Sequence, residues 1–325
     1  MALEVMTPGD MPLLEPRHQP VFCRELLSLL PVVPGGVYVD GTVGEGGHAD
    51  AILKASAPTG LLIGLDRDEE AVARVQKRLE GSYDPKRFFL MRASYTALPA
   101  FLHKLGKTTV DGIVLDLGLS SRQLEEADRG FSFQKEGPLD MRFDRTGKLT
   151  AWEIVNRWPE KKIADCLRTW GEESWSDKIA GAIIHKRRTN PFETTTELAS
   201  FLKRAIPQQF QSHRIHAATK TFQALRIAVN EELGELQKFL DLFIPTLKNG
   251  GRAAIISFHS LEDRFVKEAF RKAARKGELS LLTKKPMTPT AEEILANPRA
   301  RSAKLRVAER KGAPHNGVSP KGELH

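Results

Sequence analysis

The stretch that most constrains the fold is VYVDGTVGEGGHADAIL, residues 37–53. It opens with β-favouring residues, reaches an acid at Asp40 and then places four glycines within seven positions. Apolar residues at helical spacing, Ala49, Ile52 and Leu53, follow the glycines. A strand that runs through a glycine turn into a helix is how an open α/β sheet builds a nucleotide pocket. The alternative is a glycine-rich hairpin, which the helical pattern disfavours because a hairpin needs a return strand.

Further apolar runs repeat the pattern of a buried strand followed by a helix. The predicted strands cover residues 61–66, 88–92, 111–116 and 252–258. Helical patterns cover about 68–79, 98–105 and 261–276. This alternation predicts an α/β fold with a Rossmann-like, doubly wound and mostly parallel sheet. Two last runs, 278–284 and 302–310, are expected to close the sheet as an antiparallel pair.

The alternation stops between about residues 122 and 216, where no convincing buried strand occurs. A glycine-rich, charged loop at 129–148 is followed by four helical patterns, which predict an inserted all-helical subdomain. One long helix over 218–247 is then expected to return the chain to the sheet. The predicted domains are a disordered leader at 1–17, a Rossmann-like domain at 18–124 and 217–310, the helical insertion at 125–216, and a disordered tail at 311–325.

Composition narrows the class of protein. The net charge is +8, and the segment 251–325 alone holds 16 Lys and Arg against 8 Asp and Glu. Such a basic surplus fits a nucleic-acid partner, and it fits a solvated face equally well. No run is long and apolar enough for a membrane helix, and the two cysteines are too far apart in sequence to suggest a disulfide framework or a zinc site. We therefore expect a cytoplasmic protein with no membrane partner and no metal.

The acid that ends the second predicted strand, Asp66, falls about 20 residues after the glycine turn. A carboxylate there can accept hydrogen bonds from both ribose hydroxyls of a nucleoside ligand, in nicotinamide dehydrogenases and in S-adenosylmethionine enzymes alike. The turn reads D-G-x-x-G-x-G-G rather than G-x-G-x-x-G. Its leading Asp40 would repel a pyrophosphate but can engage the cationic methionine part of S-adenosylmethionine. The pattern favours a methyltransferase over a dehydrogenase.

Asp116 ends the fourth predicted strand, in LDLGLSS. In a doubly wound sheet this position lies beside the first-strand turn, over the reactive end of the ligand. A carboxylate there can accept a hydrogen bond from an exocyclic amino group and orient its nitrogen toward a methyl donor. Asp116 is therefore the candidate catalytic residue. The alternative, an acid that only caps the turn, stays open beside it.

Six ordered motifs together resemble the signatures of one bacterial family, the ribosomal RNA small subunit methyltransferase H family. They are DGTVGEGGH (40–48), LDLGLSS (115–121), RGFSFQKEGPLDMR (129–142), TFQALRIAVNEEL (221–233), ISFHSLEDR (256–264) and NPRARSAKLR (297–306). The resemblance covers about residues 18–310. It implies a class I methyltransferase with an inserted helical domain, which uses S-adenosylmethionine to methylate N4 of a cytidine in the decoding region of 16S rRNA.

The resemblance also implies roles for single residues. The family's cofactor contacts correspond to Gly46, Gly47, His48, Asp66, Tyr95, Asp116 and Gln123. Tyr95 stands where the family usually has Phe, and it keeps an aromatic face for the adenine. Basic residues expected at RNA are Arg142, Arg299, Arg301, Lys304 and Arg306.

Other parts of the motifs leave alternatives open. His259 can be a base or, as the favoured interpretation, a neighbour of a helix start, and Asp140 can pair with Arg142 in the loop. Phe131 and Phe133 can stack on a flipped base or, as the safer expectation, pack in the insertion. The expected partner is 16S rRNA in the small ribosomal subunit, and a homodimer is a possible assembly. A function from another class, a non-catalytic RNA-binding assembly factor that retains the cofactor pocket, is the alternative.

Overall fold

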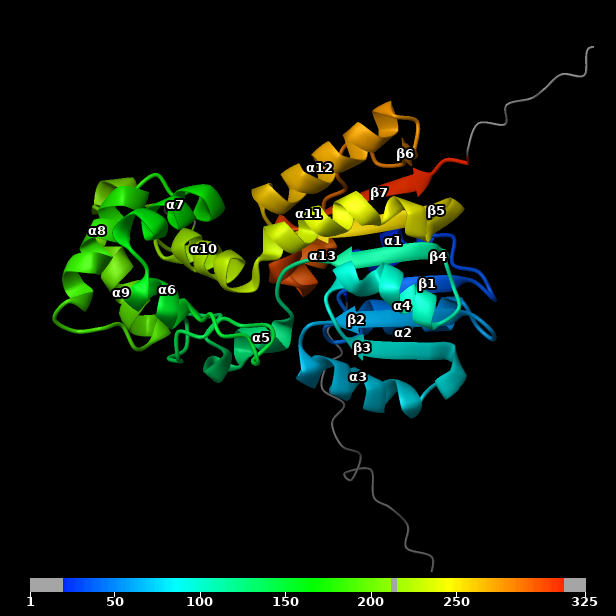
Figure 1. The fold of residues 1–325 in the computed structure, drawn as a ribbon, viewed down its shortest axis with the longest axis horizontal. Coiled ribbons are helices and arrows are strands. Elements are labelled where there is room, and N and C mark those ends of the chain that lie inside the picture. Colours follow the sequence, from blue (N-terminus) through cyan, green and yellow to red (C-terminus); the bar gives the residue numbers. More distant parts are fainter. Residues whose placement is uncertain (1–19, 212–214, 313–325) are drawn as a thin grey trace, which may run out of the picture.

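The structure is a computed structural model that describes residues 20–211 and 215–312. It contains a seven-stranded sheet flanked by helices, with a separate lobe of helices beyond one end of the sheet (Figure 1). The predicted leader at 1–17 and most of the predicted tail at 311–325 lie outside the described residues. Within the described part of the chain no helix has the length and apolar character needed to cross a membrane.

The sheet has the strand order β3-β2-β1-β4-β5-β7-β6. Its strands are β1 (Val37–Asp40), β2 (Leu61–Asp66), β3 (Phe88–Arg92), β4 (Val110–Asp116), β5 (Leu247–Ser257), β6 (Leu279–Leu281) and β7 (Lys304–Arg310). Neighbours from β1 to β5 pair in parallel, whereas β7 pairs antiparallel with both β5 and β6. The doubly wound sheet and its antiparallel closing pair are confirmed. Strand β5 begins earlier than predicted, because Leu247 pairs with Val110 beyond an irregularity in the register.

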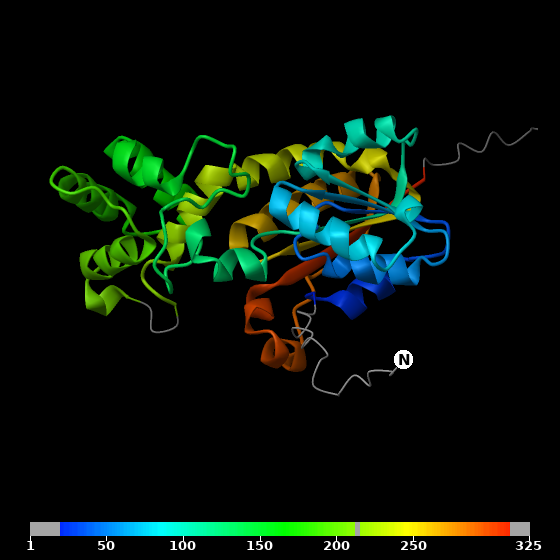
Figure 2. The same cartoon turned by 90° about the horizontal axis from the view of Figure 1, so that it is seen from below.

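Helices cover both faces of the sheet, because side chains along each strand alternate between its two faces. Tyr38 packs with the first group of helices, whereas its neighbours Val37 and Val39 pack with the second group. The first group is α1 (Cys23–Leu29), α2 (Gly47–Ala55) and α3 (Glu69–Glu80). The second is α4 (Leu98–Lys104), α11 (Glu232–Leu242) and α12 (Ser260–Arg275). The result is the three-layered arrangement expected of a Rossmann-like fold, seen edge-on in Figure 2.

The helical lobe has a hydrophobic core of its own, made by buried residues between Phe131 and Val229. Its helices are α6 (Ala151–Arg157), α7 (Glu160–Gly171), α8 (Ser176–Arg187), α9 (Thr195–Ala205) and α10 (Thr219–Asn230). Both Phe131 and Phe133 pack in or against this core, as expected. The predicted insertion at 125–216 supplies most of the lobe, and α10 shares the same core. The domain boundaries themselves stay a prediction.

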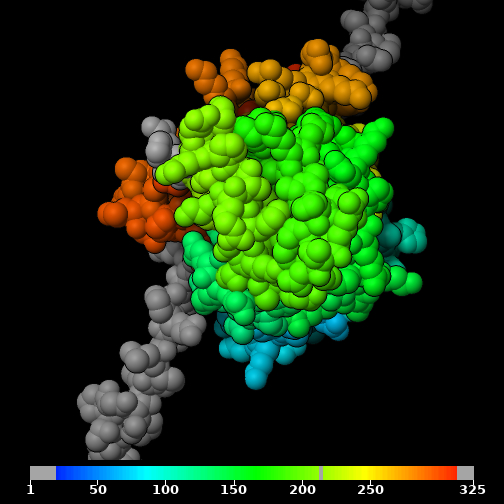
Figure 3. Space-filling model, turned by 90° about the vertical axis from the view of Figure 1, so that its left-hand side faces the viewer, coloured from blue at the N-terminus to red at the C-terminus, as the bar shows by residue number. Residues whose placement is uncertain are grey.

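Two short helices and several single turns complete the chain. Helix α5 (Ser121–Glu125) leads from β4 into the lobe, and α13 (Ala291–Ala296) precedes β7. The 3-10 turns are Pro85–Arg87, Tyr95–Ala97, Ala127–Arg129, Gln208–Phe210, Ile244–Thr246 and Pro298–Ser302. Seen from the lobe side, the α13 region projects beside the green lobe (Figure 3).

The prediction of one unbroken helix over 218–247 is wrong. Helix α10 ends at Asn230, and Glu231 takes a left-handed conformation, φ 52°, before α11 begins. The buried side chain of Asn230 explains the break, because it donates to the carbonyl of Met141 and accepts from the N–H of Phe143. These bonds fasten the end of α10 to a distant loop. The α10–α11 joint, residues 230–232, is therefore fixed by tertiary contacts rather than by a local helix breaker.

Candidate active site

A single cavity of about 310 Å³ lies at the carboxyl ends of the central strands. On one side it is lined by the glycine turn after β1, by Asp66 at the end of β2 and by Asp116 at the end of β4. On the other side it is lined by the α10–α11 joint and by the turn between β5 and α12. The carboxyl ends of strands at a topological switch point are where doubly wound sheets bind ligands. The cavity thus lies between the sheet and the helical lobe.

The glycine turn has a backbone that other residues would strain. Gly44 and Gly46 have left-handed φ values of 50° and 71°. A Cβ added to Gly41 would lie 2.3 Å from a side-chain carbon of Leu115, so a larger residue at this position would clash with β4. The N–H of Gly44 donates to Oδ2 of Asp66 at 2.8 Å, which ties the turn to β2. The sequence pattern and the geometry therefore agree at this turn.

Asp40, His48 and Asp116 form a buried cluster beside the turn. Asp40 is fully buried, and burial raises its pKa to about 6. Nε2 of His48 lies 3.5 Å from Oδ2 of Asp116. Burial disfavours the charged imidazole, but the carboxylate of Asp116 favours it more strongly, so the pKa of His48 is raised. Among the described residues, Oδ2 of Asp40, both ring nitrogens of His48 and Oδ1 of Asp116 have no hydrogen-bond partner. Buried polar atoms without partners are rare, so this cluster indicates a ligand-binding site.

Asp66 and Gln123 are partly committed to the protein itself. The two oxygens of Asp66 accept from the N–H groups of Gly44 and Asp68, and burial raises its pKa. The amide of Gln123 caps α5 at Ser120 and donates from Nε2 to Asp68 at 2.9 Å. Each carboxylate oxygen still has a second lone pair, and an amide NH2 has a second hydrogen. Both side chains can therefore serve a ligand without giving up their structural bonds.

The structure brings six of the seven expected cofactor contacts to this cavity. They are Gly47, His48, Asp66, Tyr95, Asp116 and Gln123. Gly46 is the exception, since its carbonyl accepts from Arg78 outside the cavity lining. Tyr95 packs edge-on against Phe239, and burial raises the pKa of its phenol. It therefore offers the cavity a neutral aromatic wall.

Sequence reasoning missed the wall opposite the glycine turn. Arg226, Glu232, Phe258 and Glu262 line it. All four belong to the motifs at 221–233 and 256–264, so the motifs pointed to these segments but not to their roles. Arg226 and Glu232 approach only because the chain bends at Glu231, φ 52°. An expected straight helix could not have placed them there.

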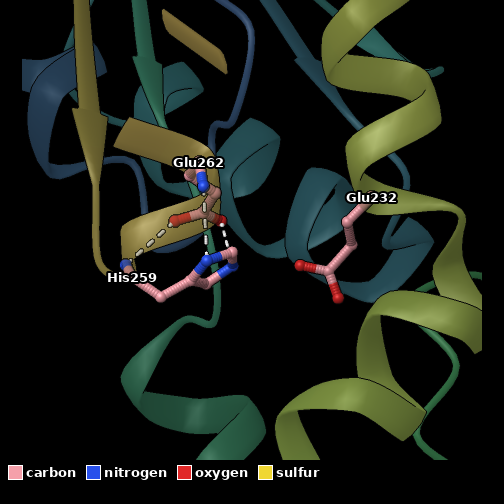
Figure 4. Close-up of side chains that lie close together, drawn as sticks. All are labelled: Glu232, His259 and Glu262. Atoms are coloured by element: carbon pink, nitrogen blue, oxygen red, sulfur yellow. Dashed lines mark hydrogen bonds and ion pairs between the residues drawn. The ribbon is translucent and has the colours of Figure 1, made fainter. Parts of the chain in front are cut away.

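Glu232, His259 and Glu262 bring potential metal-binding atoms within 4.8 Å of one another (Figure 4). His259 is the N-cap of α12, and its Nδ1 accepts from the N–H of Glu262 at 3.3 Å. In the neutral ring the proton therefore lies on Nε2, which faces Oε1 of Glu262 at 3.2 Å. A nitrogen that carries a proton offers no lone pair to a metal. The donors fit a helix cap and not a metal ligand set.

The residues expected at RNA are not equivalent in the structure. Arg299 lines the cavity and forms an exposed ion pair with Glu125, and Arg301 is exposed. Arg142 is held by Asp140, 2.6 Å from Nη2 to Oδ2, as the sequence suggested. Lys304 and Arg306 both pair with Asp263, and Arg306 is buried. Of these five residues, Arg299 is the one that lines the cavity, and Arg301 is exposed two residues further along the chain.

Comparison with known proteins decides the family. The family model of the MraW methylase family matches residues 15–311. The chain belongs to the MraW methylase family. A relative from Syntrophobacter fumaroxidans, named ribosomal RNA small subunit methyltransferase H, is 47% identical over 324 residues, which are 95% of this chain and 100% of the relative. A relative of the same name from Halothermothrix orenii is 44% identical over 90% of this chain and 98% of its own length.

Solved structures that align with this chain are more distant in sequence. TrmN from Thermus thermophilus aligns with a TM-score of 0.43 at 12% identity, over 89% of this chain and 48% of TrmN. Fibrillarin from Aeropyrum pernix, solved with natively bound S-adenosyl-L-methionine, aligns with a TM-score of 0.39 at 11% identity, over 88% of this chain and 72% of fibrillarin.

This member of the family is an S-adenosylmethionine-dependent methyltransferase. Its sheet has the class I methyltransferase fold. The cavity fits that cofactor on its own chemistry. Carboxylates at Asp66 and Asp116 suit a cationic ligand, and Oδ2 of Asp40 and Oδ1 of Asp116 have no hydrogen-bond partner among the described residues. Tyr95 offers the aromatic face that an adenine ring needs. The expected cofactor is therefore confirmed by the family and suits the site.

Proposed function

We propose that this methylase transfers a methyl group to the exocyclic N4 of a cytidine in the decoding region of 16S rRNA. Support comes from the family, from relatives named ribosomal RNA small subunit methyltransferase H, and from the position of Asp116. That carboxylate ends β4 at the cavity, and its Oδ1 has no hydrogen-bond partner among the described residues. A free acceptor at this point is what an amino-group substrate requires.

The chain's residues have separable roles in this proposal. Gly47 and His48 hold the cofactor's methionine part, Asp66 its ribose, and Tyr95 and Gln123 the adenine side, while Gly46 shapes the turn through its left-handed backbone. When bound, S-adenosylmethionine supplies an electrophilic methyl group on a cationic sulfur. Asp116 accepts an N–H of the target amine, which turns the nitrogen toward the methyl and draws the departing proton. Rate enhancement comes mainly from orientation rather than covalent catalysis.

The substrate and its setting complete the proposal. The basic residues beside the cavity, Arg299 and Arg301, hold RNA phosphates. Incubation with unmodified small subunits, followed by mass spectrometry of the rRNA, should locate one N4-methylated cytidine. A ribosomal substrate places the protein in the cytoplasm. Whether the enzyme works as a homodimer stays a prediction.

Asp116→Asn is the variant that tests the catalytic assignment. We expect kcat to fall about a hundredfold or more, because a neutral amide cannot take the proton. Calorimetry should show S-adenosylmethionine affinity within about tenfold of wild type, since the turn and Asp66 remain. The control is Asp128→Asn, an exposed acid that pairs with Arg145. Full activity of Asp116→Asn would remove Asp116 from the mechanism. Cofactor binding by wild type without transfer would favour the non-catalytic assembly factor.

A further inference from the structure

The strongest unassigned feature is the ion pair between Arg226 and Glu232 on the wall opposite the glycine turn. Nε of Arg226 donates to Oε1 of Glu232 at 2.8 Å, and Nη2 donates to Oε2 at 2.9 Å. Both side chains are nearly buried, with 14% and 10% of their surface exposed, and both line the cavity. Two residues that line the ligand cavity and already share two hydrogen bonds constitute a preorganised recognition surface.

The pair retains hydrogen-bonding capacity on its cavity side. A guanidinium has five N–H donors, and Glu232 uses two of them, at Nε and Nη2. Nη1 makes no hydrogen bond within residues 20–211 and 215–312, and Nη2 keeps its second hydrogen. Each oxygen of Glu232 also keeps a lone pair. Along one edge the pair thus presents an acceptor, Oε2 of Glu232, followed by donors from Nη2 and Nη1 of Arg226.

We propose that Arg226 and Glu232 read the Watson–Crick edge of the target cytosine. This inference rests on the proposed function. The edge of cytosine presents, in order, a donor at N4, an acceptor at N3 and an acceptor at O2. Acceptor, donor and donor is the complementary order, and it is the one that guanine offers in a base pair. The pair therefore mimics guanine for a base withdrawn from its helix.

The same edge rejects uracil. Uracil presents an acceptor at O4 and a donor at N3, so two of its three positions would face like groups of the pair. Buried polar groups left without partners are costly, which converts the mismatch into specificity. In the cytosine complex Glu232 accepts one N4 hydrogen and Asp116 accepts the other. The two carboxylates then hold the amino group from both sides.

Neighbouring groups keep the pair in place and charged. Burial works against the charge of Glu262, yet His259 and Arg226 hold its pKa below the usual range. Oε2 of Glu262 also accepts from the N–H of Phe258 at 2.9 Å, so this second acid is tied to the start of α12. Glu262 acts as a positioning residue, because its negative charge favours the guanidinium beside it. Burial disfavours the charge of Arg226, but Glu232 and Glu262 outweigh it and raise the pKa.

A purely structural role is the competing explanation. Arg226 belongs to α10 and Glu232 begins α11, so their ion pair also spans the α10–α11 joint. If the ion pair only joins the two helices, as a structural brace, it requires opposite charges on the two helices, whichever helix carries which charge. A base reader requires the guanidinium and the carboxylate in their present positions. The double exchange Arg226→Glu with Glu232→Arg separates the two, because it keeps a brace but reverses the order of donors and acceptors.

The first experiment measures base discrimination without turnover. Fluorescence anisotropy measures the affinity of two RNA fragments for protein loaded with S-adenosylhomocysteine. One fragment carries an unmethylated cytidine at the target position, and the other carries uridine at that position. Wild type should bind the cytidine RNA about tenfold more tightly. Glu232→Gln should bring the two affinities within about threefold, because an amide offers either a donor or an acceptor. Equal affinities for wild type, or unchanged discrimination in Glu232→Gln, would overturn the proposal.

The second experiment measures methyl transfer. Arg226→Lys should lower kcat/KM for RNA at least tenfold and leave the cofactor affinity unchanged. The double exchange should recover the folding stability that either of its single substitutions loses, but it should not recover activity. Arg264→Met is the matched control, since it removes an exposed pair with Glu172 that also joins lobe and sheet, 2.8 Å apart. Recovery of activity in the double exchange would establish a brace. Absence of transfer by wild type would refute the proposed function instead, so the two failures are distinguishable.

Discussion

At the scale of single residues, the site contains one buried and two half-buried acids, and the burial of Asp40 in particular costs the protein stability. Asp40, Asp66 and Asp116 end three adjacent parallel strands, and their charges repel one another. Oδ2 of Asp40 has no partner within the described chain. Proteins lose stability at functional sites, because a site for a charged ligand keeps polar groups without partners in the protein. The proposed function explains these acids by the cationic ligand that they would bind.

Asp40→Asn tests that cost. Burial raises the pKa of Asp40 from 3.8 to about 6, so the folded state favours the neutral acid. Its contribution to stability is full below about pH 4 and is lost as the pH rises through 6. Asparagine stays neutral and should raise the unfolding free energy of the cofactor-free protein by about 3 kcal/mol at pH 8, with the gain shrinking toward pH 4. Urea unfolding at both pH values measures it, and a pH-independent gain would contradict the explanation.

His259 offers a second test at this scale. Its Nδ1 caps α12 and its Nε2 faces Glu262, so a cap rather than a base is expected. His259→Asn keeps a good capping side chain, and kcat should stay within about tenfold of wild type. His259→Ala should lose about 1 kcal/mol of stability. A fall of a hundredfold or more in His259→Asn, with stability intact, would show that the imidazole acts as a base.

At the scale of elements, apolar runs followed by helical patterns were enough to predict the parallel strands. The runs at 61–66 and 88–92 match β2 and β3 residue for residue. The α10–α11 joint was not predictable, because no Gly or Pro marks it and the partners of Asn230 lie at Met141 and Phe143. Half of the cavity wall depends on that joint. The cofactor side of the site could therefore be read from local sequence, whereas the wall opposite required tertiary structure.

Asn230→Ala measures what the joint contributes. The variant loses bonds to the carbonyls of Met141 and Arg226 and leaves the N–H of Phe143 without its acceptor. We expect a loss of about 2 to 4 kcal/mol in urea unfolding, since these groups are buried. Methyl transfer should fall further than the folded fraction does, because Phe143 lines the cavity. Asn249→Ala, at an exposed position in β5, is the control. A loss below about 1 kcal/mol would mean that the joint is held elsewhere.

At the scale of the whole molecule, the cavity is lined by residues of both the sheet and the helical lobe. The α13 region lies beside the lobe (Figure 3). The basic surplus of the last 75 residues is divided by the fold rather than presented as one surface. Arg299 is 43% exposed in its ion pair, whereas the Arg306 side chain is 8% exposed and donates two hydrogen bonds to Asp263. Sequence could count these charges but could not distinguish a cation at the cavity mouth from one inside a buried pair.

Substitutions of the exposed and of the buried arginines should therefore have different effects. Arg299→Ala and Arg301→Ala should weaken RNA binding at all sequences and lower the slope of log affinity against log salt by about 1 each, because each loses one phosphate contact. Arg306→Ala should instead lose about 2 to 4 kcal/mol of stability, because it leaves the largely buried Asp263 with only the longer, 3.4 Å pair with Lys304.

Anisotropy across a salt titration and urea unfolding measure the two effects separately. Lys54→Ala is the control, since Lys54 is exposed in the last turn of α2, at the opposite end of that helix from the glycine turn. A lowered salt slope with normal stability in Arg306→Ala would show that the pair with Asp263 opens to RNA. An unchanged slope in both Arg299→Ala and Arg301→Ala would move the RNA path away from the cavity mouth.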